Sequence, residues 1–167
     1  MTSTLKADKI EGVTASGTVQ MPAGHVIQVQ RTYTADASSS GQTSSTTLVA
    51  SGIQCSITPK FSNSLILVDF SSSMATSASN DYIIGRMYLK IGSASIAQMT
   101  GADQYHLGYQ RYDQNRYAPF CFGGSYTATS TDTLMFEPYI RAGFGNSNVS
   151  LVHPDGSSSL TVMEIAQ

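Results

Sequence analysis

Charged residues are scarce in this sequence: Asp, Glu, Lys and Arg make up 12% of its 167 positions, about half the usual share. The nine Lys and Arg residues occur singly, and the formal net charge is −2. Nucleic-acid binding depends on clustered basic groups that neutralise phosphates, so we expect no nucleic-acid partner. No apolar run approaches the roughly 18 residues of a membrane-spanning helix, so we expect no membrane insertion.

Cysteine is almost absent as well, with Cys55 and Cys121 alone. Two residues are too few for a disulfide framework, and these two lie too far apart for a paired metal motif. Both stand in apolar, strand-like runs, GIQCSITP and APFCFGG. This setting favours buried free thiols that pack as small hydrophobic groups, with a disulfide as the alternative.

Catalytic signatures are missing too. His25, His106 and His153 occur beside many serines, but none forms part of a nucleophile elbow. The acidic residues are spread along the chain, and no His-rich, Asp-rich or glycine-loop motif suggests a metal or phosphate site. We therefore predict a protein without catalytic residues, metal or cofactor. A glycoside-cleaving pair of carboxylates brought together by folding is the enzymatic alternative.

Hydroxyl residues take the place of the missing charges: there are 25 Ser and 17 Thr, alongside 14 Gly. These residues are weak helix formers and suit short strands and tight turns. Apolar alternation and turn residues predict eight to ten short strands and no helix. The fold class is therefore all-β, an antiparallel β-sandwich or jelly roll with an extended N-terminal arm.

Several local features refine this prediction. In 25–35, Ile27, Val29 and Tyr33 share one face of a half-buried strand. Residues 46–59 form two short strands broken at Gly52, and 63–74 is a strand with apolar residues on both faces. In the next strand, 82–92, Gly85 indicates a bulge or a close approach.

Three further features concern the second half of the chain. The segment 93–101 is a short hairpin partner of strand 82–92. Pro138 donates no ladder hydrogen bond, so it indicates an edge or bulged strand. Residues 148–167 form a hairpin around Pro154-Asp155-Gly156.

The first 24 residues differ from the rest. Leu5, Ile10 and Val13 are too sparse for a core and fit neither a helical nor a strand period, and no apolar region of a signal peptide follows Lys6. This pattern predicts an extended arm over 1–24 that lies on another protein surface, followed by one domain over 25–167.

One region is unusually rich in tyrosine. The run YHLGYQRYDQNRY interleaves aromatic rings with amides and charges, an arrangement that suits glycan or peptide recognition. A sheet surface or subunit interface is the more conservative interpretation. The candidate receptor residues are Tyr105, Tyr109, Tyr112, Asn115, Arg116 and Tyr117.

Four segments carry a resemblance to a known family: STLKADKIEG at the start, MPAGHVIQVQ, GIQCSITPKFSNSLILV and SLTVMEIAQ at the end. The chain resembles a family of bacteriophage virion proteins, found in phages of cyanobacteria and other aquatic bacteria and often labelled tail fibre or structural protein. The resemblance implies a jelly roll, usually trimeric, that is made in the host cytoplasm and built into the virion.

Three functions follow from these patterns and the resemblance. The first is a homotrimeric short fibre or spike, mounted on capsid or tail proteins by Leu5, Ile10 and Val13 and used in host attachment, with a cell-surface glycan as the expected receptor. The second is a capsid decoration or cement protein. The third, a small polysaccharide-degrading enzyme, has the least support. The apolar runs at 65–70 and 83–91 are expected to be buried between subunits.

Overall fold

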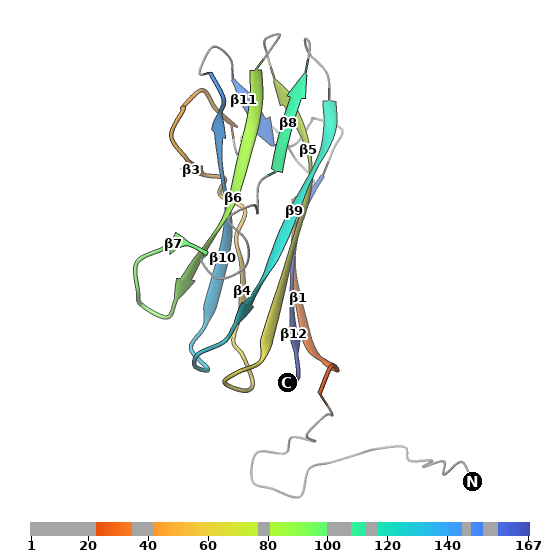
Figure 1. Ribbon diagram of the computed structural model, residues 1–167, viewed down its shortest axis with the longest axis vertical. Coiled ribbons are helices and arrows are strands. Elements are labelled where there is room, and N and C mark those ends of the chain that lie inside the picture. Colours follow the sequence, from red (N-terminus) through yellow and green to blue (C-terminus); the bar gives the residue numbers. More distant parts are fainter. Residues whose placement is uncertain are drawn as a thin grey trace, which may run out of the picture.

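The chain folds as an all-β sandwich of two antiparallel sheets, which confirms the predicted fold class (Figure 1). The computed structural model describes residues 23–34, 42–76, 81–99, 108–112, 117–144, 148–151 and 157–167. Within these ranges there are twelve strands and no helix. The arrangement is consistent with a jelly roll. The arm predicted over 1–24 lies almost wholly outside the described residues, so its boundary stays a prediction.

Sheet A consists of six strands in the order β1-β12-β5-β11-β2, with β9 paired to the other edge of β5. Their bounds are β1 (Val26–Thr34), β2 (Gln42–Thr43), β5 (Leu65–Thr76), β9 (Tyr117–Thr127), β11 (Val149–Leu151) and β12 (Ser158–Ile165). Three of these strands, β12, β5 and β9, lie side by side over most of their length. These three strands form the central part of sheet A, and β1 pairs with β12 as an edge strand.

Sheet B consists of six further strands in the order β3-β10-β6-β7, with β4 paired to β10 and β8 paired to β6. Their bounds are β3 (Val49–Ala50), β4 (Cys55–Ile57), β6 (Asp81–Ile91), β7 (Ala97–Gln98), β8 (Gly108–Tyr112) and β10 (Leu134–Ala142). The short β7 pairs with β6, as the hairpin prediction for 93–101 requires.

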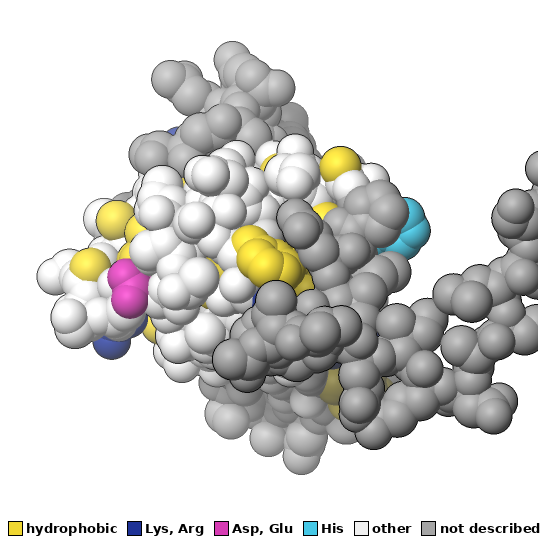
Figure 2. All heavy atoms as spheres, turned by 90° about the horizontal axis from the view of Figure 1, so that it is seen from below, with side chains coloured by type: hydrophobic (Ala, Val, Ile, Leu, Met, Phe, Trp, Pro, Cys, Tyr) yellow, Lys and Arg dark blue, Asp and Glu magenta, His cyan; other side chains and the backbone are white. Residues whose placement is uncertain are grey.

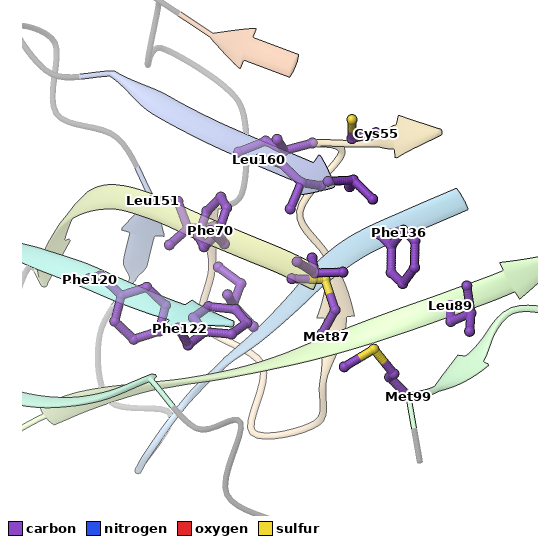
Figure 3. Close-up of a cluster of buried hydrophobic side chains, with 14 of the residues drawn as sticks. Cys55, Phe70, Met87, Leu89, Met99, Phe120, Phe122, Phe136, Leu151 and Leu160 are labelled. Carbon is purple, nitrogen blue, oxygen red and sulfur yellow. The ribbon is translucent and has the colours of Figure 1, made fainter. Parts of the chain in front are cut away.

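The core fills the space between the two sheets with aliphatic and aromatic side chains. Alternate residues of β5, among them Ile66, Val68 and Phe70, point inward and are almost fully buried. Figure 3 shows Phe70 beside Phe120 and Phe122, and the Phe122 ring lies edge-on to both, with centroids 5.2 and 5.3 Å away. Such edge-to-face pairs suit aromatic packing.

Gly85 allows this aromatic cluster to approach the backbone of β6. A Cβ atom placed there would lie 2.8 Å from both Phe120 Cζ and Phe122 Cε1. The pairing of β6 with β10 continues through Gly85 without a register shift, and the pairing with β8 extends regularly as far as Gly85. The prediction of a close approach is therefore confirmed, and the bulge is not present.

The break predicted at Gly52 is confirmed, and it explains how β10 can contain Pro138. Gly52 has a positive φ of 77° and separates β3 from β4, which pair in succession with β10. Ser51 N donates to the Pro138 carbonyl, so the proline nitrogen points to the same side, toward the break. Strand β10 is therefore interior rather than an edge, and proline is tolerated because the ladder is interrupted opposite it.

The hairpin predicted over 148–167 is wrong. Strands β11 and β12 both run antiparallel to β5, with Leu151 opposite Met74 and Ser159 opposite Ser71. They therefore point the same way and follow one another along the same edge of β5. The twelve-residue β5 is long enough to pair with both in succession, and β11 and β12 do not pair with each other. The turn residues Pro154–Gly156 lie outside the described residues.

The apolar face expected for β1 points outward. Val29 and Tyr33 are 52% and 58% exposed. A register shift between Val26 and Gln28 precedes this arrangement. The opposite face carries Gln28 and Thr32, whose side chains donate to the carbonyls of Thr58 and Gln54. The side chains on the inner face of this edge strand thus supply hydrogen-bond donors to backbone carbonyls next to β4. Apolar side chains at these positions could not do so.

Candidate self-association surface

The outward face of sheet A is the most unusual surface of the body. Directly opposed residues on antiparallel strands share a face, so the register defines rows across β1, β12 and β5. One row is Val26–Ile165–Leu65 and the next is Val29–Met163–Leu67. These six side chains, which we call the basal patch, are all apolar.

Exposure distinguishes the basal patch from the rest of the apolar residues. Val26 and Val29 are each 52% exposed, and Leu65, Leu67, Met163 and Ile165 are half-buried. Single exposed apolar residues are ordinary, but contiguous apolar patches commonly mark an interface. The basal patch joins residues from three strands that are far apart in the sequence.

Two opposite charges border the basal patch in the next row. This row is Arg31–Thr161–Asp69, so Arg31 and Asp69 are two strands apart, about 10 Å at ~4.8 Å per strand. Arg31 Cζ lies 5.7 Å from the centroid of the exposed Tyr33 ring. Within the described part of the chain, neither Arg31 nor Asp69 forms an ion pair.

Beyond the charged row, sheet A is lined by small hydroxyl and thiol groups. The row Tyr33–Ser159–Ser71–Cys121 crosses all four strands. Cys121 is a free, exposed thiol whose Sγ donates to Ser71 Oγ over 3.4 Å. Cys55 is free and buried, as predicted, but the prediction that Cys121 is buried is wrong, because its outward position on β9 has no second layer over it.

Sheet B presents a more polar outward face. Its half-buried side chains on β6 include Arg86, Tyr88 and Lys90. The rings of Tyr88 and Tyr139 stack with centroids 3.9 Å apart, and Arg86 donates to Gln98 over 2.7 Å. Burial, with Glu137 and Tyr88 nearby, raises the pKa of Tyr139, so its phenol remains neutral at pH 7. Two pairs of side chains on this face thus contact each other, Tyr88 with Tyr139 and Arg86 with Gln98.

Gly24 and His25, where the predicted arm would join the body, lie at the same end of the sandwich as the basal patch. Gly24 N donates to the Ala166 carbonyl and Ala166 N to the His25 carbonyl, each over 2.8 Å. In Figure 1 both β1 and β12 reach the lower end of the body there. Seen from that end, the described surface shows mainly uncharged side chains and backbone, with scattered apolar groups (Figure 2).

A buried carboxylate fixes the entry strand to the body. Glu164 accepts hydrogen bonds from Gln28 Nε2 over 2.6 Å and from the amides of Lys60 and Phe61 over 2.9 and 3.2 Å. Burial alone would raise the pKa of Glu164, but the hydrogen bonds that it accepts outweigh burial and hold the pKa below its ordinary value. The carboxylate is therefore ionised at neutral pH.

The predicted receptor residues fall at the opposite end of the body, as far as they are described. Tyr109 and Tyr112 belong to β8, with Tyr112 opposite Asp81, and Tyr117 begins β9 opposite Ala75. The ten residue steps along β5 from Leu65, which lies in the row of Val26 at the start of β1, to Ala75 span roughly 33 Å at ~3.3 Å each.

The remaining predicted site residues lie outside the described residues: the receptor candidates Tyr105, Asn115 and Arg116, and the arm residues Leu5, Ile10 and Val13. The structure describes backbone but not side chains for Tyr109, Tyr112 and Tyr117. Whether these tyrosines form one recognition surface therefore stays a prediction.

Two other features bear on chemistry. A cavity of about 250 Å³ opens between β7 and β9, lined by Leu89, Ile91, Met99 and Tyr126 with Ser95 and Gln98 among others, and no charged group lines it. Among the described residues, no group of three or more His, Cys, Asp or Glu could hold a metal, and no helix could span a membrane.

The comparisons with known proteins yield partial structural likeness. No family model and no curated protein matches the chain. A structure titled as Eiger TNF from S. frugiperda aligns with 10% identity and a TM-score of 0.49, covering 83% of this chain and 92% of the other.

Viral and carbohydrate-binding structures also align. Infectious bursal disease virus, Gx strain, gives 9% identity and a TM-score of 0.42 over 95% of this chain and 42% of the viral one. The CBM22-1 xylan-binding domain from Paenibacillus barcinonensis Xyn10C aligns with 10% identity and a TM-score of 0.31, and the alignment covers 89% of this chain and 99% of that domain. At these scores no functional conclusion follows.

Proposed function

We propose that this chain is a structural protein of a bacteriophage virion, a homotrimeric short fibre mounted by residues 1–24 and used in host attachment. One observation carries the proposal: Gly24 and His25, where the arm would join the body, lie at the end of the sandwich opposite the strand ends of Tyr112 and Tyr117. A subunit that is mounted on the particle by one end and contacts the host with the other needs these two regions at opposite ends of its body. The resemblance of both chain ends to phage virion proteins supports the same function.

The arm supplies the test of mounting. Replacing Leu5, Ile10 and Val13 with Asp in the phage is expected to leave the protein folded and abundant in the infected cell but absent from purified particles. A matched control replaces Thr4, Thr14 and Thr18 with Asp, which adds the same charge without removing apolar groups. Normal incorporation of the apolar-to-Asp variant would contradict the arm's role as an anchor.

A capsid decoration or cement protein is the second candidate, because the described body contains no long shaft. Quantitative mass spectrometry of purified virions separates the two. A copy number equal to that of the capsid lattice sites supports decoration, whereas a number matching the tail or the vertices supports a fibre. The enzymatic alternative, polysaccharide cleavage, predicts release of oligosaccharides from host envelopes by the purified protein.

A further inference from the structure

We infer that copies of this chain meet through the outward face of sheet A, with Arg31 of one copy opposite Asp69 of the next. This inference rests on the proposed homotrimer and names the surface that forms it. The surface consists of the basal patch together with the charged row above it. Sheet B does not offer an equivalent surface, because Arg86, Lys90 and Arg141 lie along its outward side.

The composition of the face favours a second copy over an unrelated partner. Its two described charges are of opposite sign, and neither has an ion-pair partner among the residues that the structure describes, so the face is complementary to itself. A partner of one dominant charge would leave either Arg31 or Asp69 against a like charge, which disfavours such a complex. An apolar centre with few charges is typical of homo-oligomer interfaces.

The position of the two charges also favours one direction for the symmetry axis. Arg31 and Asp69 occupy one cross-strand row and therefore the same height along the strands. A rotation axis parallel to the strands preserves that height, so it brings Arg31 of one copy level with Asp69 of its neighbour. The same axis places every arm at one end of the assembly, which mounting requires. A two-fold axis perpendicular to the strands would place the arms at opposite ends.

The first test measures the mass of the full-length protein at micromolar concentration by light scattering. The wild type is expected near 53 kDa, three times the 17.8 kDa chain. Leu67→Asp places a charge in the basal patch, on the interior strand β5, and should reduce the mass to that of one chain. Met135→Asp is the matched control, because Met135 is also half-buried and outward on an interior strand, but of sheet B. It should stay trimeric.

The second test remains informative even if Leu67→Asp fails to fold. Arg31→Asp and Asp69→Arg each place like charges together, and each should raise the concentration of half-dissociation about tenfold or more. The double variant exchanges the two charges and should return that concentration to within about threefold of the wild type. Additive losses in the double variant would show that the two residues do not meet.

Other outcomes overturn the inference in distinguishable ways. A trimer that persists in Leu67→Asp places the interface elsewhere and leaves the virion role intact. A wild-type monomer removes both the interface and the homotrimer. If Leu5→Ser/Ile10→Ser/Val13→Ser abolishes the trimer in an otherwise folded chain, the arm of a neighbour rather than its sheet covers the face.

Discussion

Gln28 and Glu164 join the first and last strands of the body through a 2.6 Å hydrogen bond from the amide to the carboxylate. The same carboxylate holds the backbone of Lys60 and Phe61, so one side chain connects β1, β12 and the loop before β5. Strands β1 and β12 carry two thirds of the basal patch, and the loop leads directly into β5, which carries the rest. The shape of the candidate interface therefore depends on a buried charge beneath it.

The ionisation of Glu164 predicts a loss of stability in acid. Its folded pKa is lowered, so its contribution is complete above the unfolded value of about 4.5 and is lost as the pH falls through the folded pKa. Glu164→Gln should lower the stability by about 1–3 kcal/mol at pH 7, because a charged acceptor of several bonds is removed.

Thermal unfolding at pH 7 and pH 3.5 measures this effect. From pH 7 to pH 3.5, the melting temperature of the wild type should fall further than that of Glu164→Gln, because the variant has no carboxylate to protonate at this position. Equal losses in both proteins would contradict the assignment of this pH dependence to Glu164.

Gly85→Ala should destabilise the protein by about 1–3 kcal/mol, a typical cost of overpacking. The added methyl would lie 2.8 Å from the rings of Phe120 and Phe122, which are themselves packed against the core. Ser56→Ala, at an exposed position on β4, is the control and should stay within about 0.5 kcal/mol of the wild type. Chemical denaturation of the three proteins checks the prediction, and an unchanged midpoint for Gly85→Ala would refute the tight packing.

Cys121 provides an independent measure of the interface. Its thiol lies on the outward face of sheet A and is exposed in the single chain. Assembly through that face should slow its reaction with a thiol reagent, and Leu67→Asp should restore fast labelling. Cys55 is an internal control, because it is buried and burial raises the pKa of its thiol. Equally fast labelling of Cys121 in the wild type and Leu67→Asp would argue against burial of this row.

Host attachment makes a prediction for Tyr112 and Tyr117. If they contact a cell-surface glycan, Tyr112→Ala or Tyr117→Ala should reduce phage adsorption and leave the melting temperature of the trimer nearly unchanged. If they pack between subunits, the same changes should lower the stability by about 3–5 kcal/mol. Normal adsorption with a destabilised trimer would contradict the glycan hypothesis and favour decoration.

Local signals in the sequence predicted much of the fold. Gly52, Gly85 and the alternation along 63–74 each depend on residues close in sequence, and the structure confirms what they indicated. The hairpin prediction for 148–167 failed because turn residues are compatible both with a reversal of the chain and with a connection between two strands that run the same way. Pro154-Asp155-Gly156 predicted a reversal, but β5 is long enough to pair with both flanking strands in succession.

The basal patch could be predicted only in part. The apolar residues on both faces of 65–70 suggested burial between subunits, and Leu65 and Leu67 do point outward. Their alignment with Val29 and Met163 depends on the register of strands from three distant segments, which no local pattern specifies. The same applies to Arg31 and Asp69, which were single scattered charges in the sequence.

The pairing of β1 with β12 has a mechanical consequence. A force that pulls the arm away from the body acts along β1, whereas the hydrogen bonds from Val26 to Thr34 lie across it. Such a force loads these bonds in shear, so they must break together. In a strand that is peeled from a sheet, by contrast, the bonds break one after another. A subunit mounted by its arm would therefore transmit drag on the distal end into the mount without unravelling at the point where the arm enters.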